Sequence, residues 1–217
     1  MMNRLISASM NRRAVLAGIP TALLMGGCTD LITGEEARFE AETATVTQQT
    51  LSETNYQEQT IEEDVQERTF EQVDRTVVVV NMLAEYSRSV NLGLGLSGEL
   101  ARFTVLASPQ VELAGQAFNP LDDLNNQDLA LRLQEQYDNI NNIQSVDQRD
   151  RSLLGETVTV SRFEAEAQTE GEGVEVFIHI AQAQSESDFI VALGVHPKDV
   201  DETDNIDRLL EGVQHPA

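Results

Sequence analysis

Three histidines supply the ring nitrogens that could bind a metal ion or move a proton: His179, His196 and His215. Zinc sites usually bring their ligands in close pairs, such as two histidines four residues apart on a helix. These three are far apart in the sequence, and His179 alternates with the apolar residues Ile178 and Ile180. Ordinary surface or core histidines are therefore the preferred interpretation. A site shared by His179 and His196 across two paired strands stays open as the alternative.

A glycine-rich run, GLGLSG at 93–98, has the spacing of a dinucleotide-binding fingerprint. That fingerprint needs a strand, a tight turn and then a helix whose N-terminus faces the pyrophosphate. Residues 99–107 follow instead, and they run into an apolar segment that predicts a strand. The run is also one residue too short for the Gly-x-Ser-x-Gly elbow of a serine hydrolase. We expect a loop between strands that neither binds a nucleotide nor carries a nucleophile.

An acidic stretch, DVDETD at 199–204, begins like a calcium-binding loop. The template needs glycine at its sixth position and glutamate at its twelfth, where Asp204 and Leu210 stand. Acids also suit the N-terminus of a helix, so we expect a lead-in to the last helix. The single cysteine also excludes a zinc site built from several cysteines. With the histidines, the glycine run and the acidic stretch explained in this way, we expect no catalytic residue, no cofactor and no metal ion.

Strands dominate the elements that would position these residues. Alternating apolar residues predict strands at 75–90, 102–107, 156–167, 174–183 and 189–195. Short polar turns separate the last three, so we expect antiparallel pairing, with the doubly apolar 189–193 as a central strand. Weaker patterns favour a strand at 38–43, a helical turn at 46–51, a hairpin partner at 56–72 and a loop or a weak edge at 138–148.

Two helices are expected beside this sheet. The spacing of the apolar residues predicts an amphipathic helix over 121–140, with Asp122 and Asp123 near its positive end. A last helix carries Ile206 and Leu210, and Asp204 is its expected N-cap. The sequence therefore predicts one α+β domain over 38–217, an antiparallel β-sheet packed with two or more helices.

The first 27 residues have the chemistry of an export signal. Arg12 and Arg13 precede an apolar run at 14–25, and the run ends in Gly-Gly before Cys28. The run is too short to cross a hydrocarbon core, which needs about 20 residues. The segment resembles a twin-arginine signal followed by a prokaryotic lipobox. The resemblance implies removal of 1–27, a lipid on Cys28, a tether at 28–37 and anchoring at the extracellular face of the cell membrane.

The charge balance is strongly acidic. Lys and Arg number 14 against 37 Asp and Glu, a net charge of −23, and Lys198 is the single lysine. A nucleic-acid-binding protein needs a basic surface, so nucleic acid is excluded as a partner. Acidic chains with few lysines and few aromatic residues resemble proteins of salt-loving archaea, in which molar salt screens the repulsion between acids.

Four stretches resemble an uncharacterised family of haloarchaeal lipoproteins. They are FTVLASP at 103–109, FNPL at 118–121, IVALGVHP at 190–197 and LLEGV at 209–213. That family has no assigned activity, so the resemblance implies no catalytic residue. The order of elements is also similar to a PsbP-like α/β/α sandwich, a scaffold used mostly for protein binding.

The function expected from these observations is non-catalytic. We expect a lipid-anchored protein at the surface of a halophilic archaeon that binds a protein, a polymer or a small solute. The alternative is an extracytoplasmic enzyme whose site combines scattered acids with His179 or His196.

Overall fold

The computed structural model describes residues 37–70, 75–93, 96–113, 116–118, 121, 124–136, 140–169, 172–185 and 188–216. The expected signal peptide with Arg12 and Arg13, the lipidation site Cys28 and the tether up to residue 36 lie outside the described residues. Asp122 and Asp123 lie outside them as well.

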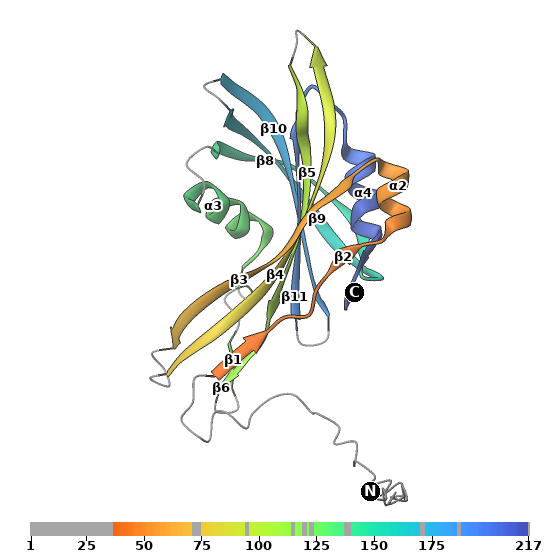
Figure 1. Cartoon of the computed structure of the whole chain (residues 1–217). Helices are drawn as coiled ribbons and strands as arrows, with labels where there is room; N and C mark the ends of the chain where they lie inside the picture. The colour runs from red at the N-terminus through yellow and green to blue at the C-terminus, as the bar shows by residue number, and fades with distance from the viewer. Residues whose placement is uncertain are drawn as a thin grey trace, which may run out of the picture.

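A single large sheet of eight strands organises the domain (Figure 1). Its strands lie in the order β3-β4-β5-β11-β10-β9-β8, and their pairings are antiparallel. The short β1 pairs in parallel with the start of β4, which makes the sheet mixed. The strand bounds are β1 Ala37–Glu40, β3 Gln57–Phe70, β4 Arg75–Gly93, β5 Leu96–Pro109, β8 Ile140–Leu153, β9 Glu156–Thr169, β10 Glu172–Ser185 and β11 Asp188–Pro197.

Three short helices cover the sheet within the described part of the chain: α2 Gln48–Thr54, α3 Asn126–Gln136 and α4 Thr203–Glu211. Helices α2 and α4 lie together on one side of the sheet, and α3 lies on the other (Figure 1). Two further strand pairs are β2 Thr45–Val46 with β12 Val213–Gln214, and β6 Val111–Leu113 with β7 Gln116–Phe118.

The central position expected for 189–193 is confirmed, because β11 lies between β5 and β10. Its residues alternate between two apolar clusters. Ile190 and Ala192 pack in the cluster that includes Leu209 and Leu210 of α4. Val191 packs in the other cluster, which includes Leu129 of α3. A strand that is covered on both faces must be apolar on both faces, as this segment is.

The expected fold class is wrong. Strands make up 68% of the structure, and the fold is β-rich rather than an α+β domain or a PsbP-like α/β/α sandwich. The difference lies in the extent of the strands and in the helices, which are short. Residues 56–72 contain the long strand β3, which confirms the hairpin partner expected there, and 138–148, expected as a loop or a weak edge, lies mostly in the edge strand β8. Backbone pairing with β4 and β9 forms these strands, although their own side chains are mostly polar and exposed.

Both expected helices begin at a different residue from the one predicted. Helix α3 begins at Asn126 because Asn125 caps it: its Oδ1 accepts hydrogen bonds from the backbone N–H groups of Gln127 and Asp128. The carboxylate of Asp128 accepts one in return from the N–H of Asn125, which completes a reciprocal cap. At α4 the N-cap is Glu202, and the expected cap Asp204 lies inside the first turn.

Candidate functional site

The structure brings two of the three histidines together. Strands β10 and β11 place Phe177 opposite His196, so that His179, two residues further along β10, lies diagonally across from His196. The two Nε2 atoms are 3.0 Å apart, the ring centroids are 5.1 Å apart, and the ring planes differ by 21°. Both residues are 1% exposed. The two rings are therefore in contact, as the alternative of a shared site requires, and both are core histidines, as the preferred interpretation allows.

The hydrogen-bond partner of Nδ1 on each ring shows which ring nitrogens carry a proton. His196 Nδ1 lies 3.0 Å from the carbonyl oxygen of Pro197, which only accepts, so Nδ1 carries a proton. At His179, Nδ1 lies 3.0 Å from Nη2 of Arg149, which only donates, so this Nδ1 is bare. Neutral His179 therefore donates from Nε2 to the bare Nε2 of His196. Every ring nitrogen has one partner, and the chain of hydrogen bonds runs from Arg149 to Pro197.

This hydrogen-bond chain needs both rings to be neutral. Burial, together with the positive charge of Arg149, lowers the pKa of His179 to about 2. Burial also lowers the pKa of His196. A cation between the rings would meet the positive charge of Arg149 and displace the shared proton. The arrangement therefore suits a fixed structural contact better than a metal ion or a proton-transfer site.

We predict that His179 makes the protein sensitive to acid. An unfolded histidine takes up a proton near pH 6.5, whereas folded His179 stays neutral down to about pH 2. Below pH 6.5 the unfolded state therefore binds more protons, and stability falls as the pH falls. Between pH 6 and pH 4 this linkage costs about 2.5 kcal/mol.

The variant His179→Gln tests this linkage. Glutamine retains one acceptor for Arg149 and one donor for His196, but it does not titrate. Denaturant unfolding of both proteins at pH 6, 5 and 4, at constant salt, should give a shallower loss of stability for the variant. Parallel losses in the two proteins would contradict the linkage.

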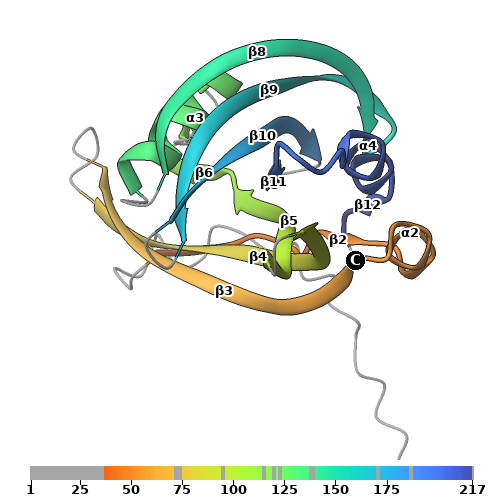
Figure 2. The same cartoon turned by 90° about the horizontal axis from the view of Figure 1, so that it is seen from above.

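Two buried acids hold α4 to the sheet: Asp207 lies within the helix, and Glu202 is its N-cap residue. Asp207 Oδ1 accepts hydrogen bonds from Arg149 Nε at 2.8 Å and Nη2 at 2.6 Å, and its Oδ2 accepts one from Arg151 Nε at 2.6 Å. Glu202 pairs with Arg88 of β4 and accepts a hydrogen bond from Asn205 Nδ2 at 2.9 Å. Helix α4 is thus held to β8 through one acid and to β4 through the other. Figure 2 shows α4 where the curved sheet is open.

The third histidine lies elsewhere. His215 Nε2 donates to Asp188 Oδ2 at 3.0 Å, and the same oxygen accepts the backbone N–H of Glu42 at 2.7 Å. Burial raises the pKa of Asp188. The contact ties the residue after β12 to the start of β11 and to the residues after β1. We assign it to packing.

Both remaining sequence motifs have a structural explanation. After Gly93 the chain enters β5 at Leu96, so a strand stands where a nucleotide fingerprint needs a helix. Residues 199–202 lead into α4, and Asp201 Oδ1 accepts the backbone N–H of Thr203 at 3.1 Å. The carboxylate of Glu202 is buried against Arg88 rather than turned toward an ion. The lead-in to the last helix that was expected at 199–204 is confirmed, whereas 96–98 lie in β5 rather than in the expected loop.

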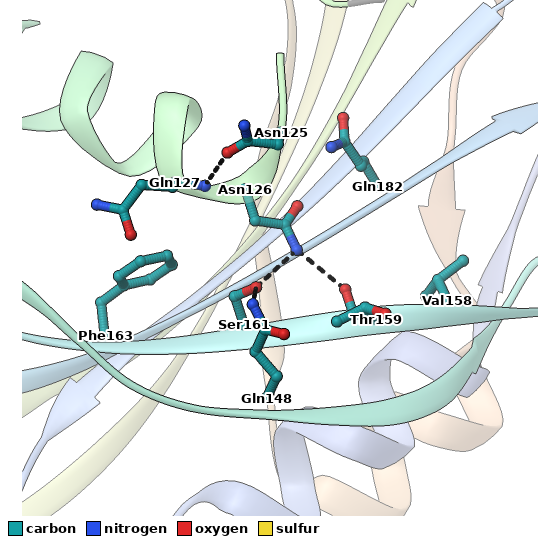
Figure 3. Close-up of a pocket in the computed structure, with 9 residues that line it drawn as sticks. All are labelled: Asn125, Asn126, Gln127, Gln148, Val158, Thr159, Ser161, Phe163 and Gln182. Carbon is teal, nitrogen blue, oxygen red and sulfur yellow. Dashed lines mark hydrogen bonds between the residues drawn. The ribbon is translucent and has the colours of Figure 1, made fainter.

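A separate pocket lies on the opposite side of the sheet, beside the first turn of α3 (Figure 3). Its volume is about 390 Å³, within the range of roughly 300–1,000 Å³ that is usual for small-molecule sites. Five side-chain amides dominate the lining, together with two hydroxyl groups and two apolar residues. The lining residues are Asn125, Asn126, Gln127, Gln148, Val158, Thr159, Ser161, Phe163 and Gln182.

Asn126 is the fixed centre of this lining. Its Nδ2 donates to the carbonyl oxygens of Thr159 and Ile180 and to Oγ of Ser161, at 2.9, 3.0 and 3.0 Å. These contacts hold the amide in one orientation, and its Oδ1 is left buried without a hydrogen-bond partner. Sequence patterns missed the site because its residues come from α3, β8, β9 and β10, and none belongs to a motif.

The described residues hold neither a cluster of metal ligands nor a membrane-spanning helix. They contain no group of three or more His, Cys, Asp or Glu side chains arranged to hold a metal ion. Their helices are also too short and too polar to cross a membrane.

Comparison with known proteins gives one family and a weak structural match. The family described as a domain of unknown function, DUF6517, matches residues 43–214. No curated protein matches the chain. Among solved structures, the crystal structure of LpqN, involved in cell envelope biogenesis of Mycobacterium tuberculosis, is 14% identical and covers 76% of this chain and 93% of its own. Its TM-score of 0.26 is too low to support an argument about fold or function.

Proposed function

We propose, for a chain that belongs to the DUF6517 family, the role of a lipid-anchored cell-surface protein that binds a ligand without transforming it. The binding site in this proposal is the amide-lined pocket beside α3. The anchor is a lipid on Cys28, attached after export directed by Arg12 and Arg13, and the native setting is molar salt at the outer face of a haloarchaeal membrane.

The chemistry of the pocket lining carries this proposal. None of its nine residues is His, Cys, Asp, Glu, Lys, Arg or Tyr, the side chains that usually serve as general acids and bases. The hydroxyl of Ser161 accepts hydrogen bonds from Asn126 and Gln148, so amides rather than a base surround it. Such a lining recognises shape and hydrogen-bonding groups and has no means of moving a proton.

Photo-crosslinking on intact cells at native salt tests this role. A photoreactive phenylalanine analogue replaces Gln127, which is exposed at the pocket, or Gln48, which is exposed on α2 at the other side of the sheet. We expect adducts several-fold stronger from position 127 than from position 48. A second variant combines the photoreactive residue at position 127 with Cys28→Ser. The loss of Cys28 should release the protein from the membrane and abolish any adduct with a surface-bound partner.

Two results would contradict the proposal. Equal adducts from positions 127 and 48 would show that the pocket is not a binding site. Retention of the Cys28→Ser protein on the membrane would remove the lipid anchor from the proposal.

A further inference from the structure

We infer that the amide-lined pocket binds an uncharged, hydroxyl-rich ligand, that is, a saccharide or a short stretch of a neutral glycan. This inference rests on the proposed binding role and names the ligand class of the same site. It follows from the charge of the lining, from its unused hydrogen-bonding atoms and from its apolar part.

The charge of the lining excludes ionic ligands. Charged residues make up 24% of the chain, and the net charge is −23, yet all nine lining residues are uncharged. An anion would find no cationic partner in the pocket, and a buried amine would find no carboxylate. Burying a charge without a partner is strongly unfavourable, so a neutral ligand fits best.

The hydrogen bonds within the lining leave acceptors for the ligand. Three amides direct their NH2 groups into the protein: Asn126 to the strands, Gln182 to the carbonyl oxygen of Leu124 at 2.9 Å, and Gln148 to Oγ of Ser161 at 3.4 Å. Asn126 Oδ1 remains buried and unpaired (Figure 3). A buried carbonyl oxygen without a hydrogen-bond partner is unfavourable, and a ligand donor that reaches it removes this cost.

Hydroxyl groups match this lining because each one both donates and accepts a hydrogen bond. Oδ1 of Asn126 is buried, so the hydroxyls of a ligand first meet the amides of Gln127 and Gln148, which are exposed at the pocket. Val158 and Phe163 supply apolar surface for the C–H groups of a sugar ring. Hydrogen bonds between neutral groups also keep their strength in molar salt, which screens ionic contacts.

Calorimetry on the full chain in molar KCl tests the ligand class. The neutral probes are maltotriose, cellotriose, mannotriose and chitotriose, and the charged probes are trigalacturonate and putrescine. We expect a neutral trisaccharide to bind with a Kd of about 1 mM or tighter and the charged probes to bind at least tenfold more weakly. Gln148→Leu and Gln127→Leu, both at exposed positions, should each weaken binding about tenfold, the effect of one lost hydrogen bond.

Gln144→Leu is the matched control, because Gln144 lies exposed on the same strand as Gln148 but outside the lining. It should bind the trisaccharide like the parent chain. A charged probe that binds as tightly as any saccharide, or no saccharide binding at all, would overturn the saccharide assignment. Equal weakening in all three variants would overturn it too. The binding role itself is judged separately by the adducts at position 127, so failure of one proposal is distinguishable from failure of the other.

Discussion

Replacing Asp207 with asparagine is expected to lower the free energy of unfolding by about 3 kcal/mol, because it breaks a buried charge network while leaving the cations in place. Asp207 is 8% exposed and accepts hydrogen bonds from Arg149 and Arg151. Asparagine keeps one oxygen, so one guanidinium group faces an NH2 group instead of an acceptor. The same substitution loosens Arg149, the residue that orders the histidine chain through His179.

Asp204→Asn is the control for this prediction. Asp204 lies on the same helix but is exposed, and the substitution removes the same charge. Its loss should cost less than about 1 kcal/mol, the usual value of an acid in the first turn of a helix. Urea unfolding of both variants at constant molar salt gives the comparison. Equal destabilisation of the two would contradict a special role for Asp207.

The sequence predicted the strands that carry alternating apolar residues and failed where polar residues are buried. Arg149 and Arg151 illustrate the failure. In the polar segment INNIQSVDQRDRSL nothing marks them as buried, yet the Arg149 side chain is only 16% exposed. Its partner Asp207 lies on α4, far along the chain. A hydropathy pattern describes a residue by itself, and this pairing exists only in the folded chain.

The histidine pair could be predicted in part. The alternation of β10 places His179 on the sheet face opposite Ile178 and Ile180, and the short turn before β11 brings His196 onto the neighbouring strand. Whether the two rings meet depends on the register of that hairpin, and a slip of one residue would move His196 to the other face. The amide pocket was beyond prediction, because four separate elements contribute to it and amides are common on any polar surface.

The last prediction concerns salt. We expect the protein to lose structure when salt is lowered from molar to about 0.01 M, because the Debye length then grows from about 3 Å to about 30 Å and acids across the surface repel one another. The loss should begin at β3, which pairs with β4 at the end of the sheet. Five exposed acids lie along this strand: Glu58, Glu62, Glu63, Asp64 and Glu67.

Hydrogen exchange at stepwise lower salt, with circular dichroism in parallel, measures both effects. A local loss of about 1.4 kcal/mol speeds exchange about tenfold, so the β3 amides should exchange first.

The triple variant Glu58→Gln, Glu62→Gln and Glu67→Gln should move the transition to lower salt. A matched triple variant removes the same charge from three exposed acids elsewhere, Glu156→Gln, Asp199→Asn and Glu211→Gln. This matched variant should move the transition less. Its three acids lie far apart in the sequence, whereas the acids along β3 are close neighbours and repel one another more strongly. A chain whose dichroism and exchange ignore salt would contradict the halophilic interpretation of its charge.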